Sequence, residues 1–419
     1  MYKLEVTLKQ HTPLIHFQWH QEGATLRASE VKPKLDKYLI SKIRDIEDKA
    51  FYNPESKSLK YKLTIIPAEE TDNSIRLEIT RDVKNDVTRY KTQLFPFFLS
   101  NMGGAANEED LKNFILNNSL KLIFLTSYQE LKNEIINNIC DFFLTHNFGN
   151  RQSKGFGSFY PDEIHLNENW YKEPKSNFYF TLSFNNRDLN SFRSAFEKIE
   201  LFYKALRGGI NIVRNNNNYF YFKSLMFLYA KQKYHALWEK RIIKEKFFIS
   251  FLNNQRKPNH MADILNFKSN DAFIFKDLLG LSTEESWLTY ESNIEKQQAQ
   301  KTHSTYRILN ENKRDIERFP SPILFKPIIT SCPNKYKMKI FIILKQKLID
   351  DYFINKSFAI IKNNVKERCI YLDTPPEFSL KDFLEFCKNI DISNHVEPIY
   401  QTTREFRILQ EIFEELHNN

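Results

Sequence analysis

Residues 148–159, FGNRQSKGFGSF, carry the strongest indication of the fold in this sequence. The chain of 419 residues has only nine glycines, and three of them lie in this stretch: Gly149, Gly155 and Gly157. Glycine lets a backbone adopt positive φ and approach a ligand closely, and successive exposed N–H groups form an anion-binding nest. Because Arg151 and Lys154 stand between the glycines, we expect the loop to contact phosphates through charge and not through base identity.

Other glycine-rich phosphate loops do not fit this stretch. No G-K-[ST] follows at the spacing of a Walker A loop, and the stretch follows a predicted helix, not the strand that a Rossmann fingerprint requires. The plainer alternative is a glycine-rich turn between a helix and a strand. Four aromatic residues either stack on bases or pack beneath the loop: Phe148, Phe156, Phe159 and Tyr160. We expect the loop at the surface, so that valine at Gly155 and Gly157 leaves the protein folded.

The residues around the loop predict alternating strands and helices in the first half of the chain. Residues 128–148, directly before the loop, repeat apolar side chains at helical spacing. Residues 28–43 have the same spacing. Runs with period two or with β-branched residues predict strands at residues 2–10, 61–67, 75–80 and 120–127.

The second half begins with the same order of elements. Residues 178–184 predict a strand and residues 191–209 a helix that the Gly208–Gly209 pair ends. One long helical stretch is expected at residues 225–248, and two late strands are expected at residues 321–328 and 337–344. We therefore predict an α+β protein with two tandem domains, residues 1–168 and 176–419, of which the second has a large helical portion.

A second candidate site precedes the first predicted helix. Ser29 and Lys32 lie in its first turns, together with Lys34, and Arg27 comes just before them. The N–H groups at a helix N-terminus favour phosphate, so these side chains are candidate phosphate contacts. The alternative is that Ser29 is only an N-cap and that the lysines form a solvated face.

Three histidines, His11, His16 and His20, fall within ten residues. Histidine titrates near neutral pH, so His16 and His20 are candidates for general acid–base chemistry. The alternative is that they are ordinary strand or loop residues. No carboxylate or cysteine accompanies them at metal-ligand spacing, and we expect neither a metal nor a cofactor.

The segment SPILFKPI, residues 321–328, has too many prolines for a central strand. With Pro320, Pro322 and Pro327 around it, we expect an edge strand or the entry to a strand. Lys326 alternates with Ile323 and Phe325, which suggests a surface cation.

The composition restricts the class of protein. The net charge of +9 favours a polyanion as partner. The four cysteines lie far apart and none forms a C-x-x-C pair, so their spacing indicates neither a zinc knuckle nor a disulfide framework. A strand-like segment follows Met1 directly, and no apolar run is long enough to cross a bilayer. We expect a cytoplasmic protein with no membrane partner.

The glycine loop ending in GFGS, the segment TPLIHF…GATLRASEVKPKL and the segment SPILFKPI together resemble the CRISPR-associated RAMP superfamily. Within it, the chain looks most like the two-domain subunit that caps type III-B effector complexes. The resemblance implies two tandem ferredoxin-like (RRM-like) domains with helical insertions. It also implies a subunit that contacts CRISPR RNA, target RNA and other effector subunits, and caps the target 3′ end without catalysis.

The residues expected to hold the RNA backbone are Arg27, Ser29, Lys32, Gly149, Arg151, Lys154, Gly155 and Gly157. The alternative within the same superfamily is a metal-independent endoribonuclease that processes CRISPR repeat RNA, with His16 and His20 as its acid–base residues. In those enzymes the glycine loop lies near the C-terminus, whereas here it closes the first half of the chain.

Overall fold

The first sheet has the alternating burial that the period of its strands predicts. Side chains along its central strand alternate between buried and half-buried from Ser119 to Thr126, because successive side chains of a strand point to opposite faces. All four strands pair antiparallel, in the order β10-β1-β9-β4. The strands of this sheet and the two helices that connect them are, in chain order, β1 (Tyr2–Gln10), α1 (Ala28–Ile40), β4 (Tyr61–Pro67), β9 (Ser119–Thr126), α2 (Gln129–Thr145) and β10 (Phe159–Pro161). This is the β-α-β-β-α-β order of a ferredoxin-like domain.

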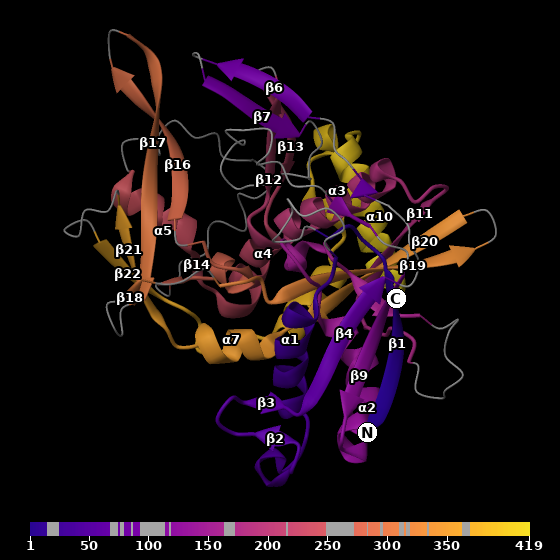
Figure 1. Cartoon of the computed structure of the whole chain (residues 1–419). Coiled ribbons are helices and arrows are strands. Elements are labelled where there is room, and N and C mark those ends of the chain that lie inside the picture. The colour runs from indigo at the N-terminus through magenta and orange to yellow at the C-terminus, as the bar shows by residue number, and fades with distance from the viewer. Residues whose placement is uncertain are drawn as a thin grey trace. The chain divides into compact units, whose positions relative to one another are not determined.

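The structure is a computed structural model of the whole chain, drawn in Figure 1. It describes residues 1–14, 25–67, 74–75, 79–84, 87–92, 114–116, 119–162, 172–214, 217–248, 272–282, 284–293, 296–309, 314–315, 319–332, 335–362 and 369–419. The chain forms two compact units. The first holds Met1–Glu200, Leu324–Ile343 and Asn419, and the second holds Leu201–Ile323 and Leu344–Asn418. Of the residues between the two predicted domains, 169–175, residues 169–171 lie outside the described residues.

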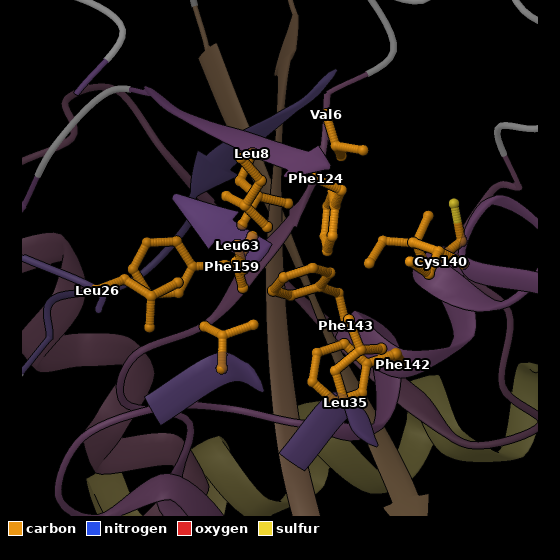
Figure 2. Close-up of a cluster of buried hydrophobic side chains, with 14 of the residues drawn as sticks. Val6, Leu8, Leu26, Leu35, Leu63, Phe124, Cys140, Phe142, Phe143 and Phe159 are labelled. Carbon is orange, nitrogen blue, oxygen red and sulfur yellow. The ribbon is translucent and has the colours of Figure 1, made fainter. Parts of the chain in front are cut away.

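One face of the first sheet is covered by the apolar stripes of α1 and α2. The buried residues of α2 follow helical spacing: Leu131, Ile135, Ile139, Cys140, Phe142 and Phe143. Figure 2 shows side chains from both strands and helices gathered into one cluster, among them Phe142 and Phe143 of α2 and Phe124 of β9. Burial of these apolar side chains is the main term that stabilises the domain.

Short elements complete the N-terminal part of the chain. They are η1 (Ile46–Asp48), β2 (Tyr52–Asn53), β3 (Ser58–Leu59), β5 (Ser74–Ile75), β6 (Ile79–Lys84), β7 (Val87–Thr92) and β8 (Phe114–Ile115). The predicted strand at 75–80 falls partly on β5 and β6, and its residues 76–78 lie outside the described residues.

A second sheet of the first unit repeats the start of this plan. It contains β11 (Tyr179–Phe184), β19 (Ile323–Cys332) and β20 (Lys335–Leu344) in the order β11-β20-β19. The helix α3 (Leu189–Arg207) follows β11 and ends where the glycine pair predicts, with Gly209 at φ 79°. The order β11-β20-β19 matches β1-β9-β4 of the first sheet, which supports two domains of one plan. β19 lies at an edge, as its prolines predict.

Most of the second unit is inserted between α3 and β19. It begins with a hairpin of β12 (Ile210–Arg214) and β13 (Asn217–Phe222). The long helix expected at 225–248 is wrong: α4 (Leu225–Tyr234) ends at His235, whose φ of 51° is left-handed, and α5 (Glu239–Phe247) begins anew after β14 (Leu237–Trp238). A left-handed residue ends a helix because the next N–H turns back to an earlier carbonyl, here Ala236 to Ala230.

The remaining elements of the second unit form a large sheet with helices after it. The sheet order is β14-β15-β22-β21-β17-β16, with β18 beside β17. Its further strands are β15 (Ala272–Phe273), β16 (Glu284–Asn293), β17 (Lys296–Leu309), β18 (Arg314–Asp315), β21 (Ser357–Lys362) and β22 (Cys369–Asp373). The helices are η7 (Lys276–Leu279), α7 (Gln346–Tyr352), α8 (Leu380–Lys388), α9 (Ile392–His395), η9 (Pro398–Tyr400) and α10 (Arg404–Asn418). The protein is thus α+β, as predicted.

Candidate nucleic-acid interface

The glycine loop, residues 147–158, joins the end of α2 to β10. Four of its residues have positive φ: Gly149 (74°), Arg151 (55°), Gly155 (89°) and Gly157 (63°). Between them lies one 3₁₀ turn, η3 (Gln152–Lys154). Glycine adopts this backbone region without strain, so the concentration of glycine here has a conformational reason.

Gly155 and Gly157 also allow close packing. A Cβ on Gly157 would lie 2.0 Å from the carbonyl oxygen of Phe148, and one on Gly155 would lie 2.9 Å from Cγ of Pro327. Both glycines are buried. The expectation that this part of the loop lies at the surface and tolerates valine is therefore wrong, because the loop folds back on its own start and onto β19.

The aromatic residues of the loop pack beneath it. At most 2% of each side chain is exposed in Phe148, Phe156, Phe159 and Tyr160. Phe156 stacks on Phe196 of α3, with ring centroids 3.9 Å apart. Of the two roles considered for these rings, packing is the one that the structure has, because buried rings offer no face for a base to stack on.

Lys326 of β19 lies under the loop and is fully buried. Its ammonium donates to the carbonyl oxygens of His146 (2.9 Å) and Phe159 (2.8 Å) and to Oδ1 of Asn147 (3.1 Å). The prediction of a surface cation is wrong, since the strand turns this side chain toward the loop and not toward solvent. The lysine ties both ends of the glycine loop to a strand about 170–180 residues away.

A buried polar network extends this attachment to the end of β1. Thr12 donates to the carbonyl of Gly155 (2.7 Å) and accepts from the N–H of Ser158 (2.9 Å). Ser158 in turn donates to the carbonyl of Pro327 (2.7 Å). These bonds hold the inner side of the loop in one conformation, because buried polar groups that lose a partner destabilise the fold.

His11 belongs to the same network and is nearly fully buried. Its Nδ1 accepts the N–H of Ile329 at 3.0 Å. Burial, with the nearby cations Arg187, Lys326 and Lys9, holds the pKa of His11 well below its usual range. The imidazole is therefore neutral and has a structural role. His16 and His20 lie outside the described residues.

The outer side of the loop carries the cations predicted to bind phosphate. Lys154 lies 3.1 Å from a carboxylate oxygen of Glu200, and about a quarter of its side chain is exposed. Arg151 is half-buried, and burial lowers its pKa. The N–H of Gly149 donates to Oε1 of Glu30 at 2.8 Å. Two donors of this outer side thus already bind anionic oxygens.

The start of α1 contributes residues to this surface, though not all those expected. Arg27 is the N-cap and is half-buried, while Ser29 is exposed within the first turn. The N-cap role considered for Ser29 is therefore wrong. Lys34, a candidate phosphate contact that the final set of RNA residues left out, lies 3.2 Å from Gln152 of the loop and 4.7 Å from the centre of the Phe148 ring. Burial lowers its pKa.

Lys32 lies on another side of α1. Its ammonium pairs with Asp36 at 2.7 Å, donates to the carbonyl of Leu59 and lies 4.0 Å from the centre of the Tyr61 ring. The spacing of two residues along a helix explains the difference, since residues i and i+2 point to different sides. Its contact with RNA stays a prediction.

The described residues contain no group of three or more histidine, cysteine or carboxylate side chains placed to bind a metal ion. In the same residues no helix is long and apolar enough to cross a membrane.

Comparison with known proteins gives matches over nearly the whole chain. The family model of the Cmr1 N-terminal domain matches residues 1–210, and that of the Cmr1 C-terminal domain matches residues 221–412. No curated protein matches the chain. A chain from a cryo-EM structure of the type III-B Cmr-beta complex, bound to cognate target RNA and AMPPnP in the presence of ssDNA, is 11% identical. That alignment covers 99% of this chain and 98% of the other, with a TM-score of 0.34.

Proposed function

The chain belongs to the Cmr1 family of CRISPR-associated RAMP proteins, components of type III effector complexes, and from this premise we propose that it holds the backbone of guide and target RNA in such a complex. The RNA would lie along the outer side of the glycine loop and the N-terminus of α1. Of the expected contacts, Arg27, Ser29, Gly149, Arg151 and Lys154 lie along this path, and we add Lys34; Lys32, on another side of α1, stays a separate prediction.

The observation that carries this proposal is the placement of carboxylates on the outer donors. Glu30 accepts the N–H of Gly149 at 2.8 Å, and Glu200 lies 3.1 Å from the ammonium of Lys154. Carboxylate and phosphate oxygens use the same kind of donor. A phosphate that displaces a carboxylate would gain both an N–H donor and the partly desolvated cations beside it.

Attachment of the loop to β19 supports the same function. Lys326 and Ser158 hold the inner side of the loop through bonds of 2.7–3.1 Å. A loop fixed in advance loses little conformational entropy when it binds. The glycines at 155 and 157 would therefore act indirectly, by allowing the packing that shapes the loop, and the N–H of Gly149 would contact the ligand.

We propose further that the subunit acts in the cytoplasm, caps the complex at the end that receives the 3′ region of the target, and does not cut RNA. Within the described residues the one histidine of the N-terminal group, His11, is buried and neutral. Incubation of repeat RNA with the purified protein in EDTA tests the last point. Products ending in a 2′,3′-cyclic phosphate that disappear in His16→Ala or His20→Ala would instead support the endoribonuclease.

The binding proposal is tested with Arg151→Ala/Lys154→Ala and a matched control, Lys57→Ala/Lys62→Ala, which removes two exposed cations from β4 and the β2–β3 hairpin. Affinity for labelled single-stranded RNA is measured over a series of salt concentrations. The loop variant should reduce the slope of log affinity against log salt by about 1.4 units, roughly 0.7 per lost phosphate contact. A slope equal to that of the control would contradict a role of these cations.

A further inference from the structure

A second group of cations lies in the other compact unit, at the start of α4. Lys223 directly precedes Ser224, the N-cap of this ten-residue helix, whose side chain accepts the N–H of Phe227. Lys231 lies two turns further along the same helix. Figure 1 shows α4 after the β12–β13 hairpin.

The two lysines converge on one aromatic ring. The ammonium of Lys223 lies 4.2 Å from the centre of the Phe227 ring, and that of Lys231 lies 6.0 Å from it. Long side chains of a helix lean toward its N-terminus, and this explains how Lys231 reaches the ring of the residue four positions before it. Both charges are thereby brought to the positive end of the helix dipole.

No anion within the described residues balances these two charges. Neither lysine forms a salt bridge or a side-chain hydrogen bond with a described residue, although only 7% of Lys231 is exposed. The first turn of α4 holds no acidic residue. Two ammonium groups that lie close together without a counter-ion repel each other.

The charged groups that act on these lysines are themselves cations. Burial, followed by the charge of Lys231, lowers the pKa of Lys223 to about 8. Burial and then the charge of Arg241 lower the pKa of Lys231. Arg241, on α5, is exposed. The group facing Lys223 from α9 is His395, whose ring nitrogen bonds to the backbone carbonyl of Lys223 at 2.7 Å.

We propose that Lys223 and Lys231 form a phosphate-binding site at the N-terminal end of α4, and that its ligand is a backbone phosphate of single-stranded RNA. The choice of RNA as the source rests on the proposed function. Two converging cations and a helix N-terminus suit a phosphodiester. Phe227 is only 4% exposed, so it supports the lysines and offers no stacking surface. Binding at this site is therefore independent of base identity.

The test uses the full-length protein and three variants: Lys223→Gln, Lys223→Gln/Lys231→Gln and the control Lys233→Gln. Lys233 lies on the same helix, but it is exposed and pairs with Asp382 at 3.0 Å. Affinity for a labelled single-stranded RNA of mixed sequence is measured over a salt series. The double variant should lose about tenfold in affinity and about 0.7 units of salt slope, equally for oligo(U) and oligo(A), while the control stays near wild type. The double variant matching the control would overturn the proposal.

A second measurement distinguishes binding of inorganic phosphate from binding of RNA. It also tests the site at α4 separately from the proposed RNA contacts of the glycine loop. Inorganic phosphate, compared with chloride at equal ionic strength, should raise the melting temperature of the wild type but not of the double variant. If phosphate raises the melting temperature in this way but the double variant binds RNA as tightly as the wild type does, the site binds phosphate and RNA is not its ligand. Wild type that binds no RNA at all would overturn the assignment and the proposed function together. Should the double variant not fold, Lys223→Gln alone should still lose salt slope, and its failure to do so would refute the site.

Discussion

Replacing Lys326 by methionine tests whether the buried lysine holds the glycine loop in place. Methionine has nearly the same length, so the change removes the charge and three hydrogen bonds of 2.8–3.1 Å while leaving most of the volume filled. Each bond from a charged donor contributes at least about 1.5 kcal/mol. The variant avoids burying an ammonium, which offsets part of this loss. We expect a net destabilisation of about 3 kcal/mol.

The measurements are thermal unfolding and hydrogen exchange. A loss of about 3 kcal/mol in a unit of this size lowers the first melting transition by roughly 6–10 °C. The N–H of Phe148, which donates to the carbonyl of Gly157 within the loop, and the N–H of Gly157, which donates to the carbonyl of Pro13 after β1, should exchange faster in the variant. Lys339→Met is the control, because that lysine of β20 is half-buried and lies 5.2 Å from the ring of Tyr179. If Lys326→Met melts and exchanges like the control, the lysine does not hold the loop.

Other consequences can be checked on the same protein. Gly157→Ala should destabilise it by at least about 3 kcal/mol, since the alanine would combine φ 63° with a Cβ only 2.0 Å from the carbonyl oxygen of Phe148; an unchanged melting temperature would contradict the packing role. Burial beside Asp277 raises the pKa of Glu239 to about 7, so the folded state binds a proton more tightly than the unfolded chain, and stability should fall as pH rises from about 4.5 to 7; Glu239→Gln should remove this dependence, and an identical pH profile would refute it. RNA affinity of the wild type should weaken as pH rises past 8, where Lys223 loses its proton, and the affinity of Lys223→Gln should not. If the wild type and Lys223→Gln both give a flat pH profile, Lys223 does not contribute to binding.

Several elements of the fold could be predicted because their patterns are local. Period-two burial along β1 and β9 and helical spacing in α2 arise from side-chain directions that neighbouring residues alone set. The prolines around β19 predict its edge position for the same reason, since a proline has no N–H to offer a central ladder. The one long helix expected at 225–248 failed because His235 turns left-handed, a conformation that its residue type does not require.

Some residues of the candidate site could be predicted from the sequence, and others depend on the packing of the chain. Arg151 and Lys154 could be found from the sequence, because charge between glycines in one short loop is visible there. Lys32 and Lys34 were both candidate phosphate contacts, and the final set of RNA residues kept Lys32 and not Lys34, since which side of α1 faces the loop depends on how the helix packs. The convergence of Lys223 and Lys231 had no signal beyond two lysines eight positions apart in a lysine-rich segment.

The sequence by itself determined the order of strands and helices in the first domain, the family, and the concentration of glycine and positive charge at residues 149–157. Only the tertiary structure decided the role of the glycines on the inner side of the loop, which is to allow close packing. A chain segment near residue 326 returns to lie against the loop, buries Lys326 and leaves no room for a Cβ on Gly157. Contacts between residues so far apart in sequence depend on the packing of whole sheets. A local pattern of apolar and polar residues cannot predict them.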